Sequence, residues 1–271
     1  MTMRFAFENQ EMQNMAMERR KWSREETVLA LDLYFKIPFG KVNAHHPDVL
    51  KLARILHRPP ASLSMKIGNL GRFDPTLAAQ GIVGLAHGAK SEKQIWEEFS
   101  GRYDLLAEEC HRIRRSCYVD EETIYPDEYI KTPVGLEGYH LSKYRINQSF
   151  FRASILSAYD GRCCVTGISD RRLLIASHIK PWSICSNGNE RTDSRNGLCL
   201  SALFDRVFDC GLMTIDTEYR VVYSRVLKDA MTKEVWHQQF EPYSGYRITL
   251  PKRGVPLLEF ISFHNQNVFK G

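Results

Sequence analysis

The spacing of apolar residues predicts that the first part of the chain is helical. Val28, Leu31 and Phe35 follow one another at three- and four-residue intervals, which places them on one face of a helix. Ser23 can cap this helix at its start, and Pro38 stops it. We therefore expect a helix that begins directly after Ser23 and is buried along one side.

Two further helical segments follow this first one. One begins after Pro47 and stops at Arg58, where two prolines follow, and the next has Leu63, Ile67 and Leu70 on its inward face. Together the three segments follow the helix-turn-helix plan, in which the final helix can enter a DNA major groove. The alternative is a purely structural three-helix domain whose polar side meets water.

The third helix carries a polar face that we expect to be exposed. Ser62, Lys66 and Asn69 share this face, and Arg58 and Arg72 flank the two ends of the helix. Amide and ammonium groups can bind base edges, while arginines at helix ends suit the phosphate backbone. These five residues are the DNA contacts predicted for the first part of the chain.

The helical pattern continues to about Ile113 and then breaks. Prolines, glycines and acidic clusters between residues 120 and 140 are typical of a linker. The sequence thus predicts a lead-in (1–21), a helical domain (22–115), a linker (116–145) and a second domain (146–271).

The second domain opens with a different pattern of elements. Residues 173–175 are a short apolar run of β character that ends near His178, and residues 197–200 form a second such run. A helix is expected from Ala202 onward. The predicted order is strand, loop, strand, helix, which makes the whole chain an α+β protein.

The rest of the second domain is expected to complete its core. The pattern predicts a hairpin from 212–215 and 219–223, a helix through Trp236, a strand at 246–250 and a final helix at 256–269.

Candidate chemistry gathers on the strand-loop-strand-helix segment. Asp205 and Asp209 are four residues apart, so both carboxylates lie on one face of the helix and can hold a hard divalent cation, most readily Mg²⁺ with Mn²⁺ as a substitute. A neutral His178 can take a proton from an attacking water, and Asn196 is placed to hold the loop or the histidine. Taken singly, each of these residues also fits an ordinary structural role.

The loop between His178 and Asn196 is basic. Lys180, Arg191 and Arg195 are predicted to lie near a scissile phosphate, although solvation at the surface explains any one of them equally well.

Composition changes this picture little. Lys and Arg number 37 against 32 Asp and Glu, a formal net charge of +5 that tolerates a polyanionic partner without requiring one. The absence of a signal-type apolar segment, and of any apolar run near the roughly 18 residues that a membrane span needs, predicts a cytoplasmic protein without membrane contact. The 7 cysteines show no paired zinc-finger spacing, so reduced thiols are expected and the ligands of any structural zinc cannot be assigned.

The motifs ASHIKPW, NGLCL and DRVFD occur in the order and spacing of the HNH (ββα-metal) endonucleases, which this segment resembles from about Gly161 to Asp216. The resemblance implies that His178 is the general base, Asn196 the middle Asn, and Asp205 and Asp209 the metal ligands. Many HNH enzymes have an Asp or His before the base, where this chain has Ser177, which leaves the coordination shell open.

The first domain resembles modules that precede HNH domains in bacterial restriction endonucleases, on the residues WSREETVLALDLYF and VLKLARILHRPPASLSMKIGNLGRFDP. The two resemblances imply a metal-dependent endonuclease that cuts double-stranded DNA in a restriction or defence system. A homodimer is compatible with this expectation. The alternatives are a non-catalytic DNA-binding protein that keeps an HNH scaffold, and a nuclease for RNA or single strands. A histidine-containing final helix, FHNQNVFKG, is interpreted as structural.

Overall fold

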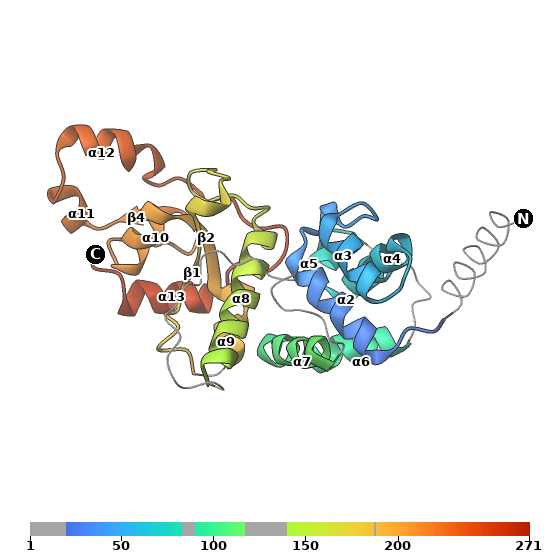
Figure 1. The fold of residues 1–271 in the computed structure, drawn as a ribbon. Helices are drawn as coiled ribbons and strands as arrows, with labels where there is room; N and C mark the ends of the chain where they lie inside the picture. Colours follow the sequence, from blue (N-terminus) through green and yellow to red (C-terminus); the bar gives the residue numbers. More distant parts are fainter. Residues whose placement is uncertain (1–19, 83–89, 117–139, 187) are drawn as a thin grey trace, which may run out of the picture. The chain divides into compact units, whose positions relative to one another are not determined.

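The computed structural model describes residues 20–82, 90–116, 140–186 and 188–271 of the chain (Figure 1). The chain divides into two compact units, Met1–Ile146 and Asn147–Gly271. Residues 1–19 of the predicted lead-in and residues 117–139 of the predicted linker lie outside the described residues. Within the described part of the chain, no helix combines the length and the apolar character that crossing a membrane would need.

The first unit is helical throughout its described residues. Its α-helices are α2 (Arg24–Lys36), α3 (Pro47–Ile55), α4 (Pro60–Leu70), α5 (Pro75–Ala79), α6 (Lys90–Phe99) and α7 (Tyr103–Ser116), with 3-10 turns at Phe39–Lys41 and Gly71–Phe73. Helix α2 begins with a capping box, in which Ser23 accepts a hydrogen bond from the amide of Glu26 and the Glu26 carboxylate accepts one from the amide of Ser23. The predicted start of this helix is confirmed.

The core of the first unit lies between α2 and the helices packed on it. Leu63, Ile67 and Leu70 are fully buried on α4, as their spacing predicts, and α2 packs against α4, α6 and α7. Helices α3 and α4 pack together across the short turn at His57, whose positive φ of 49° lets the chain reverse before Pro59. A helix-turn-helix arrangement is therefore present.

The prediction that Lys66 lies on an exposed face is wrong. Its side chain is buried, with 7% exposure for the residue, and its ammonium group pairs with Glu92 of α6. Met65 of α4, by contrast, is exposed, at 61%. The prediction failed because α6 packs against α4 from a position that the three-helix pattern does not reveal.

Arg58 is also not available at the surface. It is 3% exposed, and its guanidinium donates to the Glu26 carboxylate at 2.8 Å and to the backbone carbonyl oxygens of Arg20 and Lys21. The predicted placement of Arg58 near a phosphate backbone is therefore wrong. Through these hydrogen bonds, Arg58 connects the turn between α3 and α4 to the start of α2.

The second unit contains the two small sheets and a set of surrounding helices. Its elements are α8 (His140–Ala158), β1 (Leu174–His178), α9 (Gly188–Thr192), β2 (Gly197–Ser201), α10 (Ala202–Asp209), β3 (Met213–Ile215), β4 (Val221–Tyr223), α11 (Arg225–Asp229), α12 (Lys233–Gln239) and α13 (Leu258–Asn267), with 3-10 turns at Arg171–Leu173, Ser194–Asn196 and Glu241–Tyr243. Strands β1 and β2 pair antiparallel, as do β3 and β4. The expected α+β fold is confirmed.

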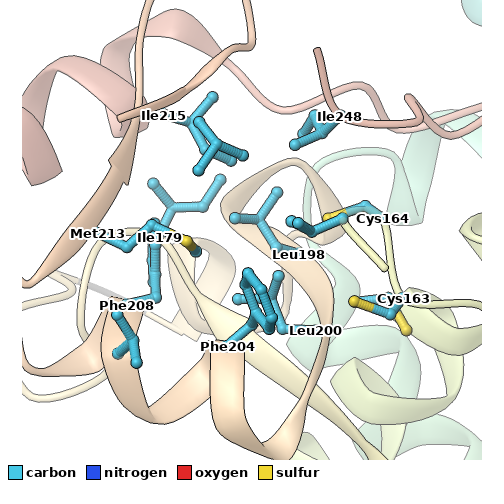
Figure 2. Packing of buried hydrophobic residues seen from close by; sticks show 14 of the residues in the cluster. Cys163, Cys164, Ile179, Leu198, Leu200, Phe204, Phe208, Met213, Ile215 and Ile248 are labelled. Atoms are coloured by element: carbon cyan, nitrogen blue, oxygen red, sulfur yellow. The ribbon is translucent and has the colours of Figure 1, made fainter. Parts of the chain in front are cut away.

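Helix α10 covers one face of the β1–β2 hairpin, and the core lies beneath it. Figure 2 shows Leu200 of β2 beside Phe204 of α10, and Phe208 of α10 on the side of Ile179 and Met213. Residues Cys163, Cys164, Met213, Ile215 and Ile248 close the same cluster. This apolar core fixes the strand-strand-helix geometry on which the candidate site depends.

The predicted strand at 246–250 does not form. Arg247 makes an isolated bridge with Arg220, the carbonyl of Tyr246 accepts from Val221, and the amide of Thr249 turns to the carbonyl of Cys164 instead. The segment runs beside β4 only briefly because its backbone hydrogen bonds go to two different parts of the chain.

Candidate active site

His178 lies at the end of β1 with its ring held between aromatic side chains. Phe151 of α8 stacks on the imidazole with ring centroids 3.7 Å apart and an interplanar angle of 15°. Trp182 meets the ring edge-on, with centroids 5.3 Å apart. These two contacts restrict both the tilt and the rotation of the imidazole.

The hydrogen bond of His178 decides which of its nitrogens can act as a base. Nε2 lies 2.9 Å from the backbone carbonyl oxygen of Arg191. A carbonyl can only accept, so Nε2 carries the proton and Nδ1 keeps the lone pair. Burial lowers the pKa of His178 to about 4, against a smaller opposing effect of the Arg191 carbonyl. At neutral pH the ring is uncharged and Nδ1 can accept a proton.

Asn196 holds the loop that supplies this carbonyl. The residue is fully buried at 0% exposure. Its Oδ1 accepts from the amide of Lys180 at 2.8 Å, and its Nδ2 donates to the carbonyl of Glu190 at 3.0 Å. Since Glu190 directly precedes Arg191, the Asn196 side chain fixes the backbone next to the oxygen that orients His178. It does so without touching the imidazole.

Gly197 makes room for the aromatic contact with His178. It pairs with His178 across the hairpin, and a Cβ at this position would lie 2.4 Å from Ile155 Cδ1 and 2.6 Å from Phe151 Cζ. A side chain would therefore press on the ring that stacks on His178.

Asp205 and Asp209 come from the helix that covers the opposite face of the hairpin. Asp205 is half-buried and Asp209 is exposed at the end of α10. Burial raises the pKa of Asp205, and burial together with the negative charge of Asp205 raises the pKa of Asp209 to about 6. The two carboxylates are thus close enough to repel each other.

Ser177 lies on β1 directly before His178, on the strand face that carries the Asp205 side of the site. Successive residues of a strand point to opposite faces, so Ser177 faces α10 while His178 faces α8. The Ser177 hydroxyl is buried. The hydroxyl lies beside the Asp205 carboxylate, because hydrogen bonding to Ser177 lowers the pKa of Asp205 against the larger effect of burial, which raises it.

These donors fit a hard divalent cation. Among the residues that the structure describes, no group of three or more His, Cys, Asp or Glu side chains is arranged to hold a metal ion. Mg²⁺, however, is commonly bound by one or two carboxylates together with water and substrate phosphate. Two mutually repelling carboxylates and the buried hydroxyl of Ser177 offer oxygen ligands only, which matches that preference.

The structure gives the three predicted loop cations different surroundings. Lys180 is ion-paired with Glu190 at 2.7 Å, and Arg195 with Asp193 at 2.7 Å. The guanidinium of Arg191 lies over Trp182, 5.5 Å from the ring centroid, and its Nε is buried with no hydrogen-bond partner among the described residues.

Sequence reasoning found the polar residues of the site but missed the aromatic ones. Trp182 belongs to the ASHIKPW motif, so its position beside His178 was a usable signal. Phe151 is 27 residues upstream of His178 and looks like any core residue of a helix. Helix α9 was taken as loop, and the residue 187 that precedes it lies outside the described residues.

The predicted DNA contacts on α4 belong to the other unit. Ser62 and Asn69 are half-buried there. Arg72 pairs with Glu92 at 3.3 Å and lies over the Phe73 ring at 4.3 Å from its centroid. Ser62, Asn69 and Arg72 keep partial exposure, whereas Lys66 and Arg58 do not.

The described cysteines all carry free thiols. Cys163, Cys164 and Cys199 lie in the core of the second unit, where burial raises the pKa of Cys199 to about 12 and that of Cys164 well above its usual value. Such thiols stay protonated and unreactive.

Comparison with known proteins assigns this site to a family. The model of the HNH endonuclease family matches residues 163–216. No curated protein matches the chain. Among solved structures, a modification-dependent TagI restriction endonuclease is similar at 19% identity and a TM-score of 0.32, over 45% of this chain and 38% of that one. The match therefore spans well under half of that protein. Residues 163–216, which hold His178, Asn196, Asp205 and Asp209, are thus a domain of the HNH endonuclease family.

Proposed function

We propose that the chain is a metal-dependent endonuclease that hydrolyses phosphodiester bonds of double-stranded DNA, with His178 as general base. The observation that carries the proposal is the hydrogen bond from His178 Nε2 to Arg191 O, within a domain of the HNH endonuclease family. A neutral imidazole with a fixed tautomer is what proton abstraction from water requires. A restriction-type role in defence is part of the proposal and rests on the resemblance of the first domain.

In this reaction His178 Nδ1 accepts a proton from the attacking water. The positive charge that develops on the ring is stabilised by the Arg191 carbonyl oxygen opposite Nε2. Phe151 and Trp182 keep the ring oriented during the transfer. Asn196 acts as a positioning residue because it holds the loop that supplies the carbonyl.

Asp205 and Asp209, with the hydroxyl of Ser177 beside them, are the residues that would hold the metal ion. A bound divalent cation supplies charge stabilisation for the phosphate and for the leaving oxygen. Arg191 is the loop cation best placed to bind the phosphate, since its buried Nε lacks a partner among the described residues. Lys180 and Arg195 would first have to leave their ion pairs.

Double-stranded DNA as the substrate is supported by the helix-turn-helix arrangement of α3 and α4. The first unit would locate the duplex, and the HNH domain would cut it. Ser62, Asn69 and Arg72 are the proposed contacts on that unit. Lys66 and Arg58 are withdrawn from this role because both are buried in ion pairs.

Cleavage of supercoiled plasmid by the purified chain tests this function. We expect nicked or linear product with Mg²⁺ or Mn²⁺ and none with a chelator, and no comparable cleavage of RNA or single-stranded DNA of matched length. Asp205→Asn and Asp209→Asn should lower the rate by orders of magnitude, with partial recovery at high Mn²⁺. Asp229→Asn, at an exposed carboxylate on α11, is the matched control and should cut normally.

Other outcomes would point to the alternatives. Duplex binding without any cleavage under every metal condition would favour a DNA-binding scaffold. Preferential cleavage of RNA or single strands would change the substrate class while keeping the chemistry.

A further inference from the structure

His264 is a buried polar side chain that the proposed chemistry does not use. It lies on α13 with 1% exposure, and its ring stacks on Phe208 with centroids 3.9 Å apart and an interplanar angle of 11°. Burial lowers the pKa of His264 to about 4, so the ring is neutral near pH 7. A neutral, fully enclosed imidazole is costly to bury unless both of its nitrogens are satisfied.

Both nitrogens of His264 have partners, and one partner belongs to α10. Nε2 lies 3.3 Å from the carbonyl oxygen of Phe208, which can only accept, so Nε2 donates to it. Nδ1 lies 2.8 Å from the hydroxyl of Thr214 on β3, and this hydroxyl, which has a single proton to donate, also hydrogen-bonds Asn265 Oδ1. The imidazole therefore connects α13 to the end of α10 and to the next strand.

Phe208 is the residue directly before Asp209, in the last turn of a short helix. Helix α10 has eight residues and ends at Asp209. Backbone amides close this last turn, since Cys210 donates to the carbonyl of Arg206 and Gly211 donates to the carbonyl of Phe208 at 2.9 Å. His264 adds a side-chain donor to the same Phe208 carbonyl. Since the Asp209 side chain projects from that turn, its position depends on what holds the turn in place.

Further contacts from the C-terminal segment act on the same turn. Gly211, at φ 72°, is so close to this segment that a Cβ would lie 2.0 Å from the carbonyl oxygen of Val268. The amide of Lys270 donates to the carbonyl of Gly211 at 2.8 Å. Asn265, next to His264, donates to the carbonyl of Ile215 on β3 at 3.1 Å. These contacts hold the chain that follows Asp209, from Gly211 to Ile215, against residues 264–270.

We propose that His264 is a positioning residue for the metal-binding carboxylate of Asp209, which it acts on through the Phe208 carbonyl and ring. The inference rests on the proposed function, because it takes Asp209 as a metal ligand. Residues that orient metal ligands without touching the metal commonly change its affinity by about 10- to 100-fold. The final helix, read from the sequence as a purely structural element, thereby gains a part in the site.

Calorimetric titration of the full chain with Mn²⁺, in the absence of DNA, tests the proposal. His264→Phe keeps the ring stack and removes both hydrogen bonds, so we expect Mn²⁺ affinity to fall by about tenfold. His264→Gln restores a donor toward Phe208 O and an acceptor toward Thr214, and should recover most of the affinity. His237→Phe, at an exposed histidine on α12, is the control and should leave affinity unchanged.

Cleavage kinetics and thermal unfolding complete the test. For His264→Phe, the metal concentration at half-maximal cleavage should rise, while the rate at saturating metal stays within about twofold of the unsubstituted chain. If His264→Phe does not fold, Thr214→Val removes one of the two hydrogen bonds of the ring and should weaken Mn²⁺ binding by a smaller factor.

The outcomes separate this inference from the proposed function. If Asp209→Asn weakens Mn²⁺ binding but His264→Phe and Thr214→Val only lower the unfolding temperature, His264 is structural and the inference is overturned. If Asp209→Asn leaves Mn²⁺ binding unchanged, the metal site itself is misplaced and the proposed function fails with it.

Discussion

The protonation of Asp209 links metal binding to pH. The pKa of this carboxyl is raised to about 6 by burial and by the charge of Asp205, so below pH 6 the metal-free site carries a proton that must leave when a cation binds. Affinity should therefore fall as the pH drops through 6, approaching about tenfold per pH unit, and level off above about pH 7.

Titration calorimetry with Mn²⁺ in two buffers of different ionisation enthalpy measures both the affinity and the released protons. Burial lowers the pKa of His178 to about 4, so protonation of this base should not limit the cleavage rate above about pH 5. At saturating metal, cleavage should therefore continue at a lower pH than it does at limiting metal. An affinity that is equal at about pH 5 and pH 7.5 would contradict the account of Asp209.

Asn196 should affect cleavage without affecting metal binding. Asn196→Ala removes the hydrogen bonds to Lys180 and Glu190 and frees the loop whose next residue orients His178. We expect single-turnover cleavage to slow by about a hundredfold, the scale of an ångström-sized misplacement of a reacting group. Asn189→Ala, at a half-buried position on α9, is the control. Mn²⁺ affinity that falls together with the rate would mean that the loop also supports the carboxylates.

At the scale of elements, local patterns in the sequence predicted the parts that depend on local order. The capping residues Ser23 and Glu26 mark the start of α2, and the apolar runs around His178 and Asn196 give β1 and β2. The i, i+4 spacing of Asp205 and Asp209 was sufficient to place both on one face of α10, one turn apart.

Features that depend on long-range packing could not be predicted in this way. Lys66 looked like a surface residue because its partner Glu92 lies 26 positions away on a different helix. Phe151 gave no sign of its contact with His178, and the 246–250 segment alternates like a strand although its hydrogen bonds go to separate partners. In each case tertiary contacts outweighed the local pattern.

The Lys66–Glu92 pair should matter for stability rather than for DNA affinity. Lys66→Ala leaves the Glu92 carboxylate, 2% exposed, with Arg72 at 3.3 Å as its remaining ion-pair partner among the described residues. Removing one partner of a buried pair commonly costs about 3 kcal/mol or more of unfolding free energy. Urea unfolding should show a loss of this size, and Lys93→Ala, at an exposed pair, should show almost none. A weaker DNA complex with unchanged stability would restore Lys66 to the DNA-contacting face.

In the whole molecule, we propose that the first unit recognises DNA and the second unit cuts it. Asn69 tests the recognition half, because a carboxamide can bind adenine through two hydrogen bonds. Asn69→Ala should change the distribution of cleavage sites while leaving the rate on a preferred site and the metal requirement unchanged. Sequencing of fragment ends measures this distribution. An identical pattern for the substituted and unsubstituted chains would move recognition to the loop between His178 and Asn196 or to the C-terminal elements.

We propose that His178 acts in the chemical step, and a paired measurement on His178→Ala tests this role. Single-turnover cleavage of a duplex with saturating Mg²⁺ is compared with duplex affinity in a chelator, and His237→Ala serves as the matched control. We expect cleavage to fall by at least about a hundredfold while duplex affinity stays within about twofold of that of the unsubstituted chain. Cleavage by His178→Ala at the unsubstituted rate would contradict this role.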